Sequence, residues 1–150
     1  MQTINVSQTL PLEPEQAFAL IADHERFLSG GALQCRITQP GNEEKNGLGA
    51  RRVVNAKSII FVEDIVAFQR PDHYEYKIVE LGGSVGRFLA LDHHGGRLQL
   101  QPHAEGTQVE WTSTFSVTTP LIGRLIERMI APGISKAFSK LLSRAANQSA

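Results

Sequence analysis

Cysteine, net charge and long apolar runs are all scarce in this sequence of 150 residues. The single cysteine, Cys35, cannot form an internal disulfide, so we expect a reducing compartment and a cytoplasmic protein. Lysine plus arginine and aspartate plus glutamate number 15 each, which leaves no basic surplus for binding a nucleic-acid backbone. No apolar run approaches the roughly 20 residues of a membrane span, and residues 1–10 lack the features of a signal peptide. These absences argue against a nucleic-acid binder and an integral membrane protein.

The length suits a single domain that spans residues 1–150. A chain of this size buries about 70% of the surface that it exposes when unfolded, so it can form a core without disulfides. The first segment, residues 4–10, alternates apolar and polar side chains as a half-buried strand does. Pro14 then suits the first turn of a helix, and residues 23–28 predict a second short helix that ends at Gly30.

From residue 33 the apolar pattern changes to a period of two, which predicts a series of strands. The predicted strands span residues 33–37, 48–55, 58–68, 74–78, 97–101 and 108–117. Short turns at residues 40–42, 70–72 and 105–107 separate several of them, and such short connections force antiparallel pairing. The glycine-rich stretch 81–96 is ambiguous, and its segment 82–86 is more typical of a mobile loop.

The last part of the chain predicts a long helix that begins at Pro120, because apolar residues recur there every three or four positions. The same apolar phase continues past Pro132, which favours one helix kinked at that proline. Two helices that meet at Pro132 and Gly133 are the alternative.

These elements predict an α+β fold in which a curved antiparallel sheet of six to seven strands wraps around the long C-terminal helix. Two short helices follow the first strand and leave a wedge between sheet and helix. A wedge lined by aliphatic and aromatic side chains is typical of a small-molecule site. The alternative is that bulky side chains simply fill it.

Four segments, in their order and spacing, resemble the polyketide cyclase/dehydrase and lipid-transfer superfamily, also called helix-grip, START-like or pollen-allergen-like. They are LEPEQAF at 12–18, FVEDIV at 61–66, RPDHYEY at 70–76 and EGTQVEW at 105–111. The resemblance covers nearly the whole chain and implies the helix-grip fold with an internal cavity. It does not imply a reaction, because members include both carriers and cyclases.

Glu63 is the most informative polar residue, because it lies in a predicted strand that is apolar on both faces. Either Glu63 or Asp64 must point inward, and the sequence leaves the choice open. The resemblance implies that Glu63 faces the cavity, as a ligand anchor or a general base. A salt bridge to Arg51 or Arg52 on the neighbouring strand is the alternative, since a buried carboxylate needs a partner.

Other candidates lie on the later strands. Tyr76 can either pack or offer its hydroxyl to a ligand, and Trp111 lies on the apolar face of the clearest strand. His93 and His94 point to opposite faces if they lie on a strand, so they do not form a metal site together. We predict no metal and no cofactor. The predicted ligand-binding residues are Arg51, Glu63, Tyr76, His93, His94, Trp111 and Phe115, and the candidate catalytic residues are Glu63 and His94.

The favoured hypothesis is a protein that binds an apolar or aromatic molecule of lipid, polyketide or isoprenoid type, with a homodimer also compatible with the sequence. The alternative is an enzyme of the cyclase/dehydratase type in which Glu63 or a histidine moves a proton. A protein-interaction module with a filled core is the third possibility.

Overall fold

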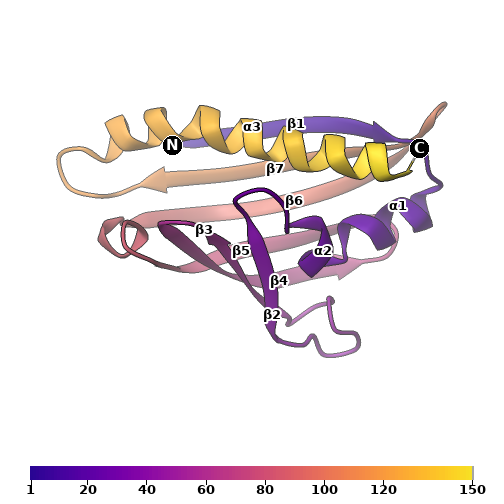
Figure 1. Ribbon diagram of the computed structural model, residues 1–150, viewed down its shortest axis with the longest axis horizontal. Coiled ribbons are helices and arrows are strands. Elements are labelled where there is room, and N and C mark those ends of the chain that lie inside the picture. Colours follow the sequence, from indigo (N-terminus) through magenta and orange to yellow (C-terminus); the bar gives the residue numbers. More distant parts are fainter. Residues whose placement is uncertain (150) are drawn as a thin grey trace.

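One antiparallel sheet of seven strands dominates the computed structural model, which describes residues 1–149 (Figure 1). The strands are β1 (Gln2–Leu10), β2 (Gln34–Gln39), β3 (Arg51–Ala56), β4 (Ile59–Gln69), β5 (His73–Gly82), β6 (Leu91–His103) and β7 (Gly106–Val117). The helices are α1 (Pro14–Ile21), α2 (His24–Phe27), the 3₁₀ turn η1 (Gly86–Phe88) and α3 (Gly123–Ser149). The predicted α+β fold of helix-grip type, with two short helices after the first strand, is confirmed.

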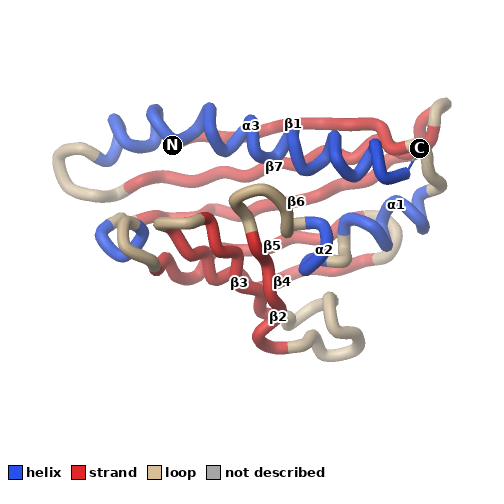
Figure 2. Tube along the Cα trace, in the orientation of Figure 1, coloured by secondary structure: helices blue, strands red, loops and turns tan. Residues whose placement is uncertain are grey.

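The sheet order is β1-β7-β6-β5-β4-β3-β2, so consecutive strands pair from β2 to β7 and β1 pairs with β7. The β6–β7 turn illustrates how short connections produce this order, since His103 and Gly106 are paired across it. β1 and β7 then form the part of the sheet over which α3 packs, as Figure 2 shows. Buried Leu141, Leu142 and Ala145 of α3 join the main apolar core.

Helix α3 is one continuous element through Pro132, as the unbroken apolar phase predicts. Its predicted start at Pro120 is wrong, and the helix begins at Gly123 instead. The reason is local, because Leu121 has a positive φ of 71°, which cannot belong to a right-handed helix. Among residues 1–149 no helix is long and apolar enough to cross a membrane.

The ambiguous stretch 81–96 is mostly ordered into named elements. β5 continues to Gly82 and β6 begins at Leu91, which leaves only residues 83–90, with η1, as the connection. The sequence left this stretch ambiguous, and the loop expected at 82–86 lies in that connection except for Gly82. Leu91 and His93 point inward while Asp92 is exposed, which is the alternation of a strand. The glycines in this stretch made that pattern hard to recognise in the sequence.

Gly96 lies at the last backbone pair between β5 and β6. It pairs with Tyr76 across the two strands, and a Cβ atom at this position would overlap the Tyr76 ring. The absent side chain therefore makes room for an aromatic ring that lies over the sheet.

We expect Gly96→Ala to lower the free energy of unfolding by about 1–3 kcal/mol, because the added methyl group overpacks the Tyr76 site. Gly133→Ala is the matched control, since a Cβ there meets nothing within 4 Å and the residue lies inside α3. That change should raise the free energy of unfolding by about 0.5–1 kcal/mol. Urea denaturation followed by circular dichroism measures both, and equal effects would contradict the steric argument.

Candidate functional site

A cavity of about 430 Å³ lies between the sheet and α3. Its wall is mostly apolar and includes Val54, Phe61, Ile78, Leu91, Trp111 and Phe138. Five residues bring polar groups to it, namely Arg52, Glu63, Tyr76, His93 and Ser113. These polar residues come from β3 to β7, one from each strand, so the sheet supplies all of them and α3 supplies only apolar wall.

The inward face of β4 is the one that carries Glu63. Ile59, Phe61 and Glu63 all line the cavity, as a strand period of two requires, and Ile65 is buried beyond them. Asp64 points to the opposite face. Beyond Glu63 the pairing of β4 with β5 shifts between Ile65 and Ala67. This bulge changes which residues of β4 point inward, and this is part of the reason that apolar residues occur on both faces of the strand.

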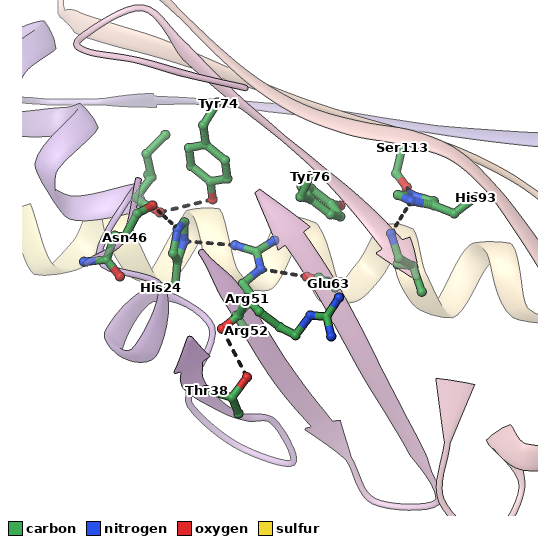
Figure 3. A network of polar contacts seen from close by, with 12 residues as sticks. His24, Thr38, Asn46, Arg51, Arg52, Glu63, Tyr74, Tyr76, His93 and Ser113 are labelled. Carbon is green, nitrogen blue, oxygen red and sulfur yellow. Dashed lines mark hydrogen bonds and ion pairs between the residues drawn. The ribbon is translucent and has the colours of Figure 1, made fainter. Parts of the chain in front are cut away.

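Glu63 forms a buried ion pair with Arg52, its direct partner across β3 and β4 (Figure 3). Nε of Arg52 donates to Oε1 of Glu63 at 2.7 Å, and the two side chains are 1% and 9% exposed. The salt-bridge alternative for Glu63 is therefore confirmed, with Arg52 as the partner. No hydrogen bond within residues 1–149 reaches the second carboxylate oxygen of Glu63, although the residue lines the cavity.

Arg52 is also held on its other side. Its Nη1 donates to Nδ1 of His24 at 2.9 Å, and Nε2 of His24 donates to the carbonyl oxygen of Asn46 at 2.9 Å. Burial, together with the nearby Arg52 charge, holds the pKa of His24 well below its ordinary value, so the ring is neutral and can accept this bond. Burial by itself lowers the pKa of Arg52, but the Glu63 carboxylate, together with the nearby Tyr74, Tyr76 and Cys35, raises that pKa above its ordinary value.

The Arg52 guanidinium also packs against the aromatic rings of β5. Its central carbon lies 4.6 Å from the ring centroid of Tyr76 and 5.7 Å from that of Tyr74. Tyr76 in turn accepts a hydrogen bond of 2.9 Å from Nε1 of Trp111, and Trp111 stacks on Phe138 of α3 at 3.8 Å. Arg52 is therefore connected to α3 through two aromatic residues.

His93 bridges β5 and β6 where their backbone pairing stops. The last paired residues are Tyr76 and Gly96, and beyond them Nδ1 of His93 accepts a hydrogen bond of 2.9 Å from the amide of Ile78. With Nδ1 as the acceptor, Nε2 carries the proton and donates to Oγ of Ser113 at 2.9 Å. Burial and neighbouring cations lower the pKa of His93 to about 4, which agrees with a neutral ring.

Arg51 and His94 do not line this cavity, which corrects their expected placement. Arg51 leaves the other face of β3 and donates from Nε and Nη2 to Asp64 at 2.7 and 2.9 Å. His94 is the extra residue at the bulge between His93 and Gly95, and it is exposed beside Asp92. The remaining predicted residues, Glu63, Tyr76, His93, Trp111 and Phe115, all lie at the cavity.

Two residues of the site, His24 and Ser113, were not among the predicted site residues, and Arg52 was predicted only as one of two possible partners of Glu63. Arg52 shares the inward face of β3 with Val54, so the strand period carries a signal for it. Ser113 carries the same signal, because it alternates inward with Trp111 and Phe115 on β7, whereas His24 has none, since Arg52 is distant from it in sequence. Cys35 is buried, and burial raises the pKa of its thiol to about 12. Within residues 1–149 no three His, Cys, Asp or Glu side chains gather closely enough to hold a metal ion.

Comparison with known proteins adds a family and a fold. The family model described as polyketide cyclase / dehydrase and lipid transport matches residues 1–149. A START superfamily protein from Mycobacterium smegmatis is 11% identical with a TM-score of 0.74, and the match covers 97% of each chain. A protein from Nitrosospira multiformis is 17% identical with a TM-score of 0.68, over 99% of this chain and 97% of that one.

The structure of Ara h 8.0201 is 17% identical with a TM-score of 0.64, over 96% of this chain and 97% of that one. No curated protein sequence matches the chain. At these identities the structural matches establish the fold alone.

The two neighbouring arginines allow a paired test of the buried ion pair. We expect Arg52→Met to lower the free energy of unfolding by about 3–5 kcal/mol, because it leaves the Glu63 carboxylate buried without a partner. Arg51→Met removes the same charge from the exposed face and should change stability little. Urea denaturation measures the free energy of unfolding of both variants. A similar decrease in both would contradict the burial of the Arg52–Glu63 ion pair.

The neutral state of His93 makes a prediction about pH. An unfolded histidine has a pKa of about 6.5, whereas the native pKa is about 4, so the unfolded chain binds the proton first as the pH falls. The free energy of unfolding should therefore decrease between about pH 6.5 and 4, by roughly 3 kcal/mol for this group, and not below that range. His93→Gln should remove this part of the slope, whereas His94→Gln should retain it, as urea midpoints across the pH range will show.

Proposed function

The chain belongs to the polyketide cyclase/dehydrase and lipid transport family, and we propose on this premise that it binds an apolar small molecule between the sheet and α3. One observation carries the proposal: a mostly apolar cavity of about 430 Å³ is lined by Glu63, one of whose carboxylate oxygens has no hydrogen-bond partner among residues 1–149. The volume lies within the range of roughly 300–1,000 Å³ that is usual for ligand pockets.

The polar groups at the wall suggest which end of the ligand is anchored. The free oxygen of Glu63 can only accept a hydrogen bond while the carboxylate is ionised, so it requires a donor on the ligand. Tyr76 accepts from Trp111 and keeps its own hydroxyl hydrogen to donate. A hydroxyl group satisfies both at once. We therefore propose a lipid, polyketide or isoprenoid-like molecule with a hydroxyl at one end.

Binding without catalysis fits the site better than the cyclase/dehydratase alternative. Glu63 and His93 line the same cavity, which favours that alternative, but no hydrogen bond within residues 1–149 joins them. Glu63 is bound to Arg52, and both ring nitrogens of His93 are engaged by Ile78 and Ser113. His93 thus has no free ring nitrogen, so Glu63 would have to move a proton without a histidine partner. An interaction module with a filled core is disfavoured by the cavity itself.

Replacement of the whole ion pair tests the anchor without leaving a buried charge. Arg52→Met combined with Glu63→Met makes the wall apolar, and such replacements are often tolerated. The probe is the neutral dye N-phenyl-1-naphthylamine, displaced by 1-decanol or by 1-methoxynonane, an ether of the same size without a donor. We expect the unaltered protein to prefer decanol by about tenfold, as for one hydrogen bond to a charged group, and the double variant to lose that preference.

The matched control is Arg51→Met combined with Asp64→Met, which removes the neighbouring ion pair on the opposite face. It should keep the preference for decanol. Failure of the dye to bind the unaltered protein, together with native mass spectrometry that detects no co-purified compound, would overturn the proposal. Binding of both alcohol and ether with equal affinity would remove Glu63 as the anchor.

A further inference from the structure

Exposed apolar side chains gather at one end of the molecule. Of the ten large hydrophobic residues that are exposed within residues 1–149, six come from residues 85–88, at η1, and residues 121–129, which lead into and begin α3. We call these six the apolar rim: Val85, Phe88, Leu121, Ile122, Leu125 and Met129. Scattered exposed apolar residues are ordinary, but a cluster of this size marks an interaction surface.

The two segments of the apolar rim lie side by side. The amide of Thr118 donates to the carbonyl of Ala90 at 2.8 Å, and the amide of Ala90 donates to Oγ1 of Thr119 at 3.1 Å. Phe88 and Leu121 each lie two residues from this connection. Figure 1 shows η1 and the start of α3 at the same end of the sheet, away from α1 and the C-terminus.

Leu121 is the least expected member of the apolar rim. Its side chain is fully exposed and its φ is 71°, in the left-handed region that branched side chains rarely adopt. A fully exposed leucine with this backbone conformation contributes no buried apolar surface to the stability of the fold. An apolar partner outside the chain accounts for it.

The apolar rim also lies at the end of the cavity. Met129 belongs to the rim and lines the cavity as well. Leu89, which follows Phe88, and Ile130, which follows Met129, line it too. A surface that covers the rim therefore lies next to the cavity interior.

Exposed arginines lie next to the apolar rim. Arg87, Arg124 and Arg128 are exposed on the same two segments. Residues 83–90 contain no acid, and Glu127, the acid among residues 121–130, is buried and accepts a hydrogen bond of 2.9 Å from the amide of Val117. Apolar side chains flanked by arginines match the surface of an anionic bilayer, whose acyl region takes the former and whose phosphates attract the latter.

A second copy of the chain fits this surface less well. In a twofold dimer the same patch meets itself, which would place the three arginines of one copy against those of the other. We propose that the apolar rim docks on the surface of an anionic lipid bilayer. This proposal goes beyond ligand binding and holds whether or not the cavity is occupied.

Vesicle flotation with purified protein and no added ligand tests the docking. We expect the protein to float with phosphatidylcholine vesicles that contain phosphatidylglycerol, and much less with phosphatidylcholine alone. Leu121→Ser combined with Leu125→Ser should weaken binding at least about tenfold, because it removes buried apolar area. Arg124→Gln combined with Arg128→Gln should weaken it by a similar factor and reduce its dependence on salt.

Matched controls carry the same changes outside the rim. Leu48→Ser combined with Val66→Ser alters two apolar residues that are about half exposed, and Lys136→Gln combined with Lys140→Gln alters two exposed cations further along α3. Both should bind vesicles like the unaltered protein. Equal losses in controls and rim variants, equal binding to both vesicle types, or no binding at all would overturn the proposal. So would a dimer, seen by analytical ultracentrifugation, that the rim variants dissociate while vesicles bind no protein.

The two proposals fail separately. The rim variants should keep the dye affinity and the preference for decanol, because they lie outside the anchor. The variant with Arg52→Met and Glu63→Met should still float with anionic vesicles. Loss of vesicle binding in that variant, at unchanged circular dichroism, would show that docking is not a property of the rim.

Discussion

The need to keep the Arg52 charge compensated inside the protein constrains the rest of the structure. An arginine with a 1% exposed side chain requires a carboxylate opposite it, and the register of β3 and β4 places Glu63 there. His24 then has to remain neutral to accept the second bond of the guanidinium, and burial keeps it so. Helix α2, β3 and β4 are in this way tied together by one cation.

The same arginine shapes the cavity. Its guanidinium lies over Tyr76, and Tyr76 can occupy that position only because Gly96 has no side chain on the next strand. Beyond this point β5 and β6 stop pairing, and the ring of His93 accepts the hydrogen bond from the Ile78 amide that the backbone leaves unpaired. The strands therefore diverge without an unsatisfied donor, and a cavity forms beside them instead of a closed sheet surface.

Two surfaces of different chemistry thus lie along α3. Towards the sheet, the helix supplies apolar wall, and the polar groups of the cavity all come from strands. At its beginning the helix exposes Leu125 and Met129 beside arginines, and Leu121 is exposed just before it, which is the arrangement that an anionic bilayer accommodates. Met129 belongs to both surfaces, so a ligand site and a docking site adjoin in this fold.

The sequence by itself determined the elements and their order, because apolar periods of two and of three to four are properties of the chain. It showed one strand with an inward acid, and Tyr76, Trp111 and Phe115 on inward faces. It could not decide between Arg51 and Arg52, between Glu63 and Asp64, or between His93 and His94, since a shift of one residue reverses every side chain of a strand. The bulges and the pairing register made those choices, and only the tertiary structure brought His24 to Arg52 and Ser113 to His93, across separations in sequence that no local pattern encodes.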